Sequence, residues 1–316
     1  MNRSVKWLAL VLTATVCLAC LWGCGKKSDE ELPETPDDTT TQLNQQELPP
    51  ESSDGMEFCN GSVTLRLILD ENDHWVWKDD PRFPLDETYA LEMLATAQEV
   101  LQLTPVPLTG ELSDYGLDST TKYIKLTGKQ GQLAVYYLGN LTDNGQYYMR
   151  RADDETNHIY LAPAALTAQV SRSIYDMAVL PQLSAMLPDH ITTITVATHT
   201  EPQLSVHLHR DSDGKWKSGT TDVTEKIQPL LSALENLQLL ACVDYKPTAG
   251  ATAICGLDPA QMCVEVSFLN TMGAESSFKM HIGTSRASGY HAMIAGDTSI
   301  YAVGGDIAVG VSKMLH

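Results

Sequence analysis

The sequence has few basic residues, which bounds the partners it can have. Lys and Arg number 21 against 40 Asp and Glu, so the formal net charge is −19 at pH 7. A surface of this sign repels phosphate backbones and anionic lipid headgroups. We therefore expect no nucleic acid among the partners of this chain.

Motifs of catalysis and cofactor binding are also missing. The sequence contains no Gly-x-Ser-x-Gly elbow, no P-loop, no dinucleotide fingerprint and no His-Glu-x-x-His pair. No residue is therefore assigned a catalytic role, no cofactor is expected, and the protein is predicted not to be an enzyme.

Cysteine is scarce outside the amino-terminal segment. Four of the seven cysteines lie beyond residue 24, and no two of these four form the Cys-x-x-Cys pair that many zinc sites use. In an oxidising compartment four cysteines could pair, but three of them lie in the last third of the chain. We predict free thiols and leave their pairing open: Cys59, Cys242, Cys255 and Cys263.

Long apolar runs are absent except at the amino terminus. Residues 7–22 carry no charge and follow the basic residues Arg3 and Lys6. The run is shorter than the roughly 20 apolar residues that span a bilayer, which is typical of a secretory signal peptide. It ends in Leu-Trp-Gly-Cys at residues 21–24, which resembles a bacterial lipobox.

The lipobox predicts a signal peptide over residues 1–23 and a lipid on Cys24, with Cys20 as the alternative attachment site. Such a lipid places the protein at the extracytoplasmic face of a bacterial membrane. The membrane is then a partner of the amino terminus.

Residues 24–60 contain little apolar material. They are rich in Asp, Glu, Pro, Thr, Gln and Ser, and their large aliphatic residues are mainly Leu32, Leu43 and Leu48. No core can form from this composition. The segment is predicted to be a disordered acidic tether between the lipid and a folded body.

A pattern of residues occurs twice in the remaining chain. Residues 115–118 read Tyr-Gly-Leu-Asp, and residues 255–258 read Cys-Gly-Leu-Asp. Each copy has a Trp-Lys pair upstream and a Gly, a Met and a Tyr downstream. The matched positions are Trp77 and Trp216, Gly139 and Gly283, Met149 and Met293, and Tyr160 and Tyr301. Self-similarity of this length predicts two homologous tandem units, at residues 61–186 and 187–316.

Each unit has the pattern of an α+β fold. The periodicities predict a hairpin, a long helix, an antiparallel meander and a closing helix. The first long helix is expected to begin at Asp86 as N-cap. The second begins near residue 221 or 222 and continues to Leu240, with Pro229 either bending it or moving its start toward residue 228. Trp77 and Trp216 are each expected to cover one end of a core.

With this signal, tether and paired pattern, the chain resembles the bacterial family called domain of unknown function 4340 over residues 61–316. Pro259 fits the proline that this family has after Gly-Leu-Asp, whereas Ser119 in the first copy departs from it. The resemblance implies an envelope lipoprotein or membrane-anchored protein with two tandem copies of the unit, of a kind sometimes associated with ABC-type transport or gliding systems. It carries over no catalytic residue.

His207 and His209 lie two apart on a predicted strand, so they project from one face. Two imidazoles can hold Zn²⁺ if a third ligand is present, and His199 is close in sequence. The first copy has a leucine, Leu67, at the corresponding place, so the fold does not need the pair. We expect a solvated face and no metal site, and keep both histidines as metal candidates.

Residues 147–151 read Tyr-Tyr-Met-Arg-Arg, the densest aromatic and basic run in this acidic chain. On a strand Tyr147 and Arg151 share one face, and Tyr148 and Arg150 share the other. Aromatic residues and arginine are enriched in interface hot spots. The run predicts a partner surface, and the alternative is that the arginines pair with the acidic residues at 153–155.

These features predict a non-catalytic envelope lipoprotein that is a binding or scaffold component of a membrane transport or surface complex. An ABC-type transporter or another envelope protein would be its protein partner. Two alternatives stay open. One is a solute-binding receptor with its ligand between the units, and the other is a secreted hydrolase with a site that these motifs do not reveal.

Overall fold

The structure is a computed structural model that describes residues 53–155, 158–199 and 203–316. These residues form a mixed α/β protein with five α-helices and two large antiparallel sheets. Cys24 and the predicted signal peptide lie outside the described residues. Within the described ranges, no helix is long and apolar enough to cross a membrane.

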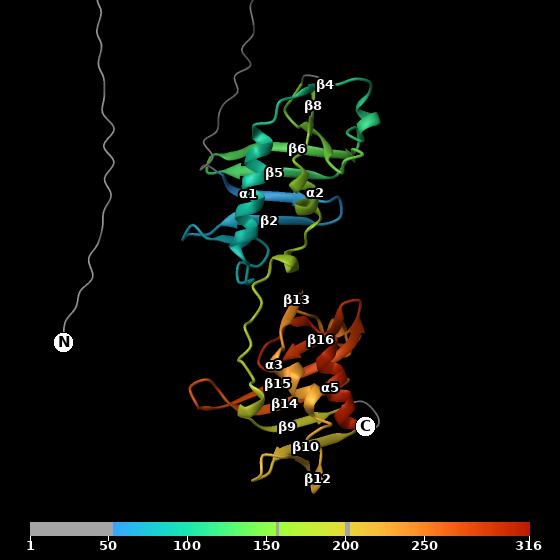
Figure 1. Cartoon of the computed structure of the whole chain (residues 1–316). Coiled ribbons are helices and arrows are strands. Elements are labelled where there is room, and N and C mark those ends of the chain that lie inside the picture. The colour runs from blue at the N-terminus through green and yellow to red at the C-terminus, as the bar shows by residue number, and fades with distance from the viewer. Residues whose placement is uncertain (1–52, 156–157, 200–202) are drawn as a thin grey trace, which may run out of the picture. The chain divides into compact units, whose positions relative to one another are not determined.

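The first sheet has eight strands (Figure 1). They are β1 (Ser53–Cys59), β2 (Thr64–Leu69), β3 (Trp75–Trp77), β4 (Val106–Pro107), β5 (Tyr123–Gly128), β6 (Gly131–Leu141), β7 (Tyr147–Arg151) and β8 (His158–Leu161). Their order across the sheet is β3-β2-β1-β5-β6-β7-β8-β4, and the paired strands are antiparallel. Strands β2 and β3 are the predicted hairpin, and β5 to β8 are the predicted meander.

Strand β1 corrects the predicted end of the tether. The composition places the tether up to residue 60, but β1 is a strand inside the sheet, paired with β2 and β5. Its Met56 and Phe58 are buried. Two large apolar residues suffice because an inner strand also gains backbone hydrogen bonds on both sides. So short an apolar pattern does not stand out from polar chain.

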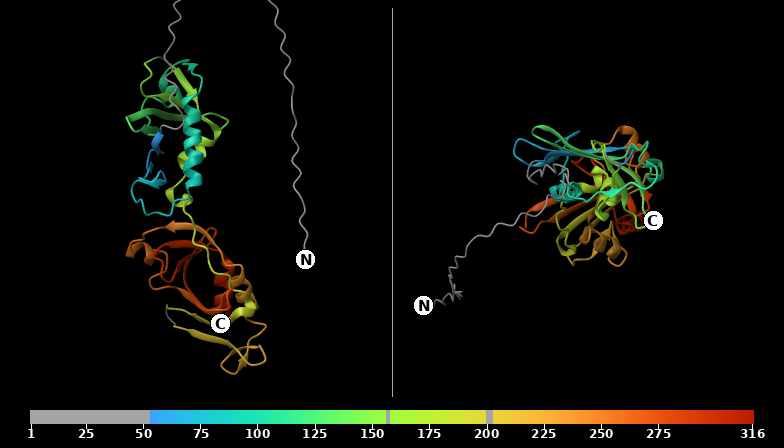
Figure 2. Two further views of the ribbon diagram at one scale, coloured as in Figure 1. Left: turned by 90° about the vertical axis from the view of Figure 1, so that its left-hand side faces the viewer. Right: turned by 90° about the horizontal axis from the view of Figure 1, so that it is seen from above.

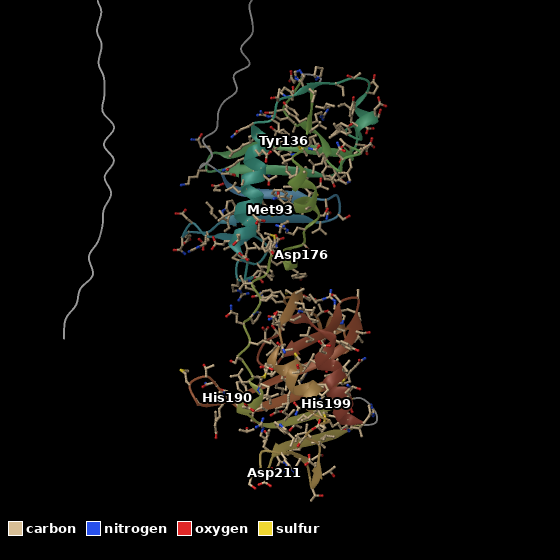
Figure 3. All side chains as sticks on the ribbon, viewed as in Figure 1. Met93, Tyr136, Asp176, His190, His199 and Asp211 are labelled. Atoms are coloured by element: carbon tan, nitrogen blue, oxygen red, sulfur yellow. The ribbon has the colours of Figure 1, made fainter. Side chains whose placement is uncertain are left out.

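Helices α1 (Glu87–Leu101) and α2 (Ala164–Ser171) lie on one face of the first sheet, and Figure 2 shows α1 from a second side. Asp86 caps α1 as predicted, because its carboxylate accepts the Thr88 N–H at 3.0 Å. Met93 of α1 and Tyr136 of β6, both labelled in Figure 3, belong to the core between helix and sheet. Full burial of one large apolar side chain stabilises the fold by ~1.5–3 kcal/mol.

The second sheet has nine strands. They are β9 (Ile191–Ala197), β10 (Ser205–Arg210), β11 (Trp216–Ser218), β12 (Thr221–Asp222), β13 (Leu239–Asp244), β14 (Met262–Leu269), β15 (Glu275–Arg286), β16 (Gly289–Ile294) and β17 (Ile300–Val303). Their order is β12-β11-β10-β9-β14-β15-β16-β17-β13. Apart from β12 at one edge, this is the strand order of the first sheet.

Helices α3 (Gln228–Glu235) and α5 (Gly305–Leu315) pack on each other, and both contribute to the core of the second sheet. The short helix α4 (Ala249–Ile254) precedes the second Gly-Leu-Asp turn. A 3₁₀ helix, η2 (Leu112–Tyr115), holds that place in the first copy.

Helix α3 is shorter than its apolar stripe predicts. It begins at Gln228 with Pro229 in the first turn, which agrees with the later of the two predicted starts. It ends at Glu235, and Leu240 belongs to strand β13 instead. Strand β13 pairs with β17. This pairing is a tertiary interaction that the local spacing of leucines does not reveal.

Trp75, rather than Trp77, takes the place that Trp216 has in the second copy. Asp70 and Asp211 start matching turns, in which each carboxylate accepts the backbone N–H groups two and four residues later at 2.8–3.0 Å. The next strand begins with Trp75 in one turn and Trp216 in the other, both buried. A shift of two residues keeps a side chain on the same face of a strand, so periodicity does not distinguish Trp77 from Trp75.

The repeated glycines allow the Gly-Leu-Asp turns to approach the sheets closely. Gly116 and Gly256 have φ values of 66° and 67°, in the left-handed region that favours glycine. A Cβ on Gly139 of β6 would overlap the carbonyl oxygen of Tyr115, and Gly283 of β15 lies in the same way against the second turn. The repeated glycines therefore have a structural role in both turns.

Strand register corrects one of the predicted matches downstream. Tyr160 pairs with Met149, and Tyr301 pairs with Ala292. Ala292, rather than Met293, therefore takes the place of Met149 in the core. The one-residue slip matters because it moves a side chain to the other face of the sheet.

Alanine substitution of the tryptophans tests the turn register. We expect Trp75→Ala and Trp216→Ala each to lower the free energy of unfolding by ~3–5 kcal/mol, the cost of removing a buried aromatic side chain. Trp77 is half-buried and packs edge-on against Phe83 at 5.6 Å, so Trp77→Ala should cost about 1–2 kcal/mol. Urea denaturation measures all three, and a larger loss for Trp77→Ala than for Trp75→Ala would refute the register.

Alkaline pH should destabilise the first core through Tyr160. Burial and the Asp154 carboxylate, which accepts the tyrosine hydroxyl at 3.4 Å, raise the pKa of Tyr160 to about 12 from a usual value of 10.0. As pH rises, Tyr160 therefore loses its proton in the unfolded chain before it does in the folded one. The stability that the protonated tyrosine contributes is lost as pH rises from about 10 to 12. We expect urea midpoints to fall less between about pH 8 and 11 in Tyr160→Phe than in wild type. An equal or steeper fall would exclude this origin.

Candidate functional site

The open face of the first sheet carries tyrosines and an arginine. Ile124, Leu138 and Met149 turn toward the helices and belong to the core. Their neighbours on the same strands must therefore point the other way, because side chains alternate along a strand. We call this surface the aromatic face, and its residues are Tyr115, Tyr123, Tyr137, Tyr148 and Arg150.

Three of these residues form a row across adjacent strands. Tyr123 of β5 is opposite Tyr137 of β6, and Tyr137 is opposite Arg150 of β7. All three side chains are half-buried. Directly opposite side chains in antiparallel strands lie about 5 Å apart, so the row is a continuous surface.

Strand β7 divides its aromatic and basic residues as the alternation predicts. Tyr147 is 6% exposed and belongs to the core, so it is wrong as part of a partner surface. Arg151 shares the alternation of Tyr147 and pairs with Asp153 at 2.7 Å, which is the pairing given as the alternative. Tyr148 and Arg150 are the two predicted surface residues that lie on the aromatic face.

Tyr115 reaches this face from the Gly-Leu-Asp turn. Its ring meets that of Tyr148 edge to face, with centroids 4.9 Å apart and planes at 79°. Its hydroxyl donates to the Thr109 carbonyl oxygen at 2.8 Å. Because Gly139 has no side chain, the turn lies directly against β6 and fixes Tyr115 beside Tyr148.

Arg150 has an aromatic neighbour and no acidic one among the described residues. Its guanidinium carbon lies 6.0 Å from the centroid of the Tyr137 ring, an arrangement worth ~0.5–1 kcal/mol at an exposed site. Its Nε is buried and has no hydrogen-bond acceptor. Five of the other six described arginines each have a carboxylate oxygen at 2.7–3.8 Å: Arg66, Arg82, Arg151, Arg172 and Arg210. The sixth, Arg286 at the end of β15, has no carboxylate of the described residues within salt-bridge distance, but it is exposed whereas Arg150 is half-buried.

Glu57 of β1 lies beside the row on the next strand, and its carboxylate already has partners. It accepts the Tyr123 hydroxyl at 3.2 Å and pairs with Lys125 at 3.6 Å. Burial and this carboxylate raise the pKa of Tyr123 above its usual value. Glu57 therefore holds one edge of the row in place.

The second sheet has different chemistry at the corresponding positions. Cys263, His281 and Met293 form the row that matches Tyr123, Tyr137 and Arg150. His281 lies 6.2 Å from His199, ring centroid to ring centroid, and burial lowers the pKa of His281. His199, labelled in Figure 3, is thus beside His281. The open face of this sheet lacks the tyrosines and arginine of the first.

His207 and His209 lie on β10, and the hairpin register corrects their match in the first sheet. His209 is opposite Lys217, the residue after the buried Trp216. In the first sheet, Ile68 is opposite Val76, the residue after the buried Trp75. The counterparts are therefore Arg66 and Ile68, whereas Leu67 is buried in the core.

The two imidazoles stack with centroids 6.2 Å apart, and His207 Nδ1 lies 3.1 Å from Thr195 Oγ1. No group of three or more His, Cys, Asp or Glu side chains within the described ranges is arranged to hold a metal ion. His199, the third histidine near them in sequence, has its ring centroid 6.2 Å from that of His281. The sheet thus does not bring these three histidines together.

Two surface hollows bear on the receptor and hydrolase alternatives. One, of about 530 Å³, includes Asp297 and Tyr301, and the other, of about 510 Å³, includes Asp222. The pKa of Asp297 is lowered overall: burial alone would raise it, but the hydrogen bonds that the carboxylate accepts from Ser299 and Tyr301 have the larger combined effect. The backbone and side chain of Thr224 lower the pKa of Asp222 to about 2. A general acid or base works best with a pKa near the working pH, and these carboxylates have moved away from it.

The four cysteines of the described body are free thiols, as predicted: Cys59, Cys242, Cys255 and Cys263. Burial raises the pKa of Cys242 to about 11 and also raises those of Cys255 and Cys263. A high pKa disfavours the thiolate that reacts or binds metals. The buried thiols therefore behave as small apolar residues.

Three residues of the aromatic face were missed by the sequence analysis, namely Tyr115, Tyr123 and Tyr137. Tyr123 and Tyr137 stand on predicted strands, and the alternation with core residues was a signal that could have found them. Tyr115 had no such signal, because it precedes a turn and its position depends on Gly139.

Comparison with known proteins places the chain in one family. Searches of curated proteins and of solved structures find no significant match. A family described as a domain of unknown function (DUF4340) matches residues 75–260. This match is one segment that begins in β3 and ends just before β14, so it runs across both sheets. Because it covers more than half of the 316 residues, the chain belongs to the DUF4340 family.

Proposed function

We propose that this protein is a non-catalytic binding component of a bacterial envelope complex, and that it docks a protein partner through the aromatic face. The observation that carries the proposal is Arg150, a half-buried arginine beside Tyr137 with no carboxylate partner in the described part of an acidic chain. Tyr and Arg dominate interface hot spots because they combine a large apolar area with directed hydrogen bonds. An ABC-type transporter or another envelope protein is the proposed partner.

A tandem duplication is the second part of the proposal, and it supports the first. The two copies share the residues that build the fold: Trp75 and Trp216, Asp70 and Asp211, Gly116 and Gly256, Gly139 and Gly283, and Tyr160 and Tyr301. They differ on the open face, where Cys255, Cys263, His281, His291 and Met293 stand for the five residues of the aromatic face. The shared fold does not require the tyrosines and Arg150, which leaves binding as their role.

The proposed anchor is a lipid on Cys24, reached through an acidic segment that ends where β1 begins at Ser53. The body would then be held at the extracytoplasmic face of the membrane. Lateral confinement raises the effective concentration of a membrane partner, so a face of modest area can suffice for docking.

The receptor and hydrolase alternatives have less support. Asp222 and Asp297 in the two hollows are engaged by neighbouring residues: Asp222 by Thr224 at 3.0 Å, and Asp297 by Ser299 and Tyr301 at 2.8 and 2.7 Å. A ligand would have to replace these bonds. We therefore favour docking on the sheet face over binding or catalysis in a hollow.

Substitution of Cys24 tests the anchor. We expect Cys24→Ser to move the protein from the membrane fraction to the soluble fraction and to leave a precursor longer by the signal peptide, because the serine cannot receive the lipid. Cys20→Ser is the matched control and should stay in the membrane. If Cys20→Ser is released and Cys24→Ser is not, Cys20 is the attachment site.

Site-specific photo-crosslinking in intact cells tests the docking surface. A benzoylphenylalanine at position 148 should give a discrete crosslinked product with an envelope protein, because Tyr148 lies on the aromatic face. The same probe in place of His291, the matching position of the second sheet, should not. Adding Arg150→Glu should reduce the product about tenfold if its charge contributes as a hot spot does. Equal products at 148 and 291, or no effect of Arg150→Glu, would remove the aromatic face as the docking surface.

A further inference from the structure

We infer that the partner presents an acidic polypeptide segment to the aromatic face, and that Arg150 binds a carboxylate of this segment. The inference rests on the proposed docking function and names the chemistry of the partner.

The state of Arg150 is the first reason. Its buried Nε has no acceptor, and no carboxylate oxygen of the described residues lies within salt-bridge distance of it. Acidic residues outnumber basic ones by 40 to 21, so carboxylates are abundant elsewhere in the chain. A half-buried guanidinium without a carboxylate of its own chain keeps its charge available, and a carboxylate carried by a partner can pair with it.

The surroundings of Arg150 favour a carboxylate over other acceptors. The planar guanidinium presents paired N–H donors that match the two oxygens of a carboxylate. The Tyr137 ring lies 6.0 Å from it, and the Tyr115 and Tyr148 rings form a rigid edge-to-face pair on the same face. Aromatic walls exclude water when a segment covers them, and the ion pair becomes stronger in the lower dielectric.

The length of the row indicates an extended segment. Adjacent strands lie about 4.8 Å apart, so the row from Tyr123 to Arg150 spans about 10 Å. Side chains on one side of an extended peptide repeat about every 6.6 Å. If residue i of the segment places its carboxylate on Arg150, residue i+2 therefore lies over the tyrosines, where an apolar or aromatic side chain fits.

The residues next to the row do not repel such a segment. Glu57 is the acidic residue beside Tyr123, and its charge is neutralised by Lys125, which lies opposite it at 3.6 Å. The remote negative charge of the chain acts over longer distances, but at about 0.15 M salt it is screened beyond about 8 Å. At physiological ionic strength the local cation decides which charge is bound.

Binding of labelled polymers to the full chain in detergent, at about 0.15 M salt, tests this chemistry. The probe is a random copolymer of glutamate and tyrosine, measured by fluorescence anisotropy, with polygalacturonate as a carboxylate polymer that is a glycan. We expect Arg150→Gln to raise the Kd for the copolymer about tenfold, since a hydrogen-bonded charge pair is lost. Arg150→Lys should restore part of the affinity, because it keeps the charge and loses the fork. Arg286→Gln removes an exposed arginine at the end of β15 that likewise has no carboxylate of the described residues within salt-bridge distance; it is the control for charge and should change the Kd less than twofold.

Each outcome decides one point. Equal losses in Arg150→Gln and Arg286→Gln overturn the inference, because they indicate a general charge effect. Polygalacturonate that binds as tightly and depends on Arg150 to the same extent also overturns it, in favour of an acidic glycan. If wild type binds no copolymer while the crosslink at position 148 persists, the carboxylate chemistry is wrong and the docking function stands. Loss of both removes the docking function as well.

Discussion

The close approach between the Gly-Leu-Asp turn and the sheet is the constraint on which the rest of each unit depends. A Cβ on Gly139 or Gly283 would overlap a carbonyl oxygen of the turn. The turn can therefore lie flat on β6 or β15, and Leu117 and Leu257 are buried beneath it. At the first turn, the same close approach places the Tyr115 ring against that of Tyr148. One packing requirement of the fold thus also assembles part of the candidate surface.

The sequence predicted the order of the elements better than their register. The α1 cap, the hairpins, the meanders and the structural glycines follow from local rules of turn chemistry and periodicity. The misplaced matches, Trp77 for Trp75 and Met293 for Ala292, are shifts of one or two residues. Such shifts are decided by which backbone groups pair across strands, as in the turns at Asp70 and Asp211. A single sequence does not contain that information locally.

The same limit explains what was found and missed at the candidate site. The run at residues 147–151 was visible as composition, and alternation correctly separated Tyr148 and Arg150 from Tyr147. Tyr123 and Tyr137 join them through cross-strand pairing over three strands. Strand β1 was assigned to the tether because its burial comes from the two strands beside it. The division of residues between the two faces of one strand was predictable, and the pairing of residues across strands was not.

Because the chain is strongly acidic, an arginine without a carboxylate partner is informative. In a protein with 40 acidic residues, five of the seven described arginines have a carboxylate nearby, and of the other two, Arg286 is exposed and Arg150 is half-buried. Keeping Arg150 apart requires neighbours that are uncharged, and its row supplies tyrosines. Apart from β12, the second sheet has the same strand order and carries Cys263, His281 and Met293 in that row, so the strand order does not demand this arrangement. Positions that differ between two sheets of the same strand order are where a binding function can be carried without cost to folding.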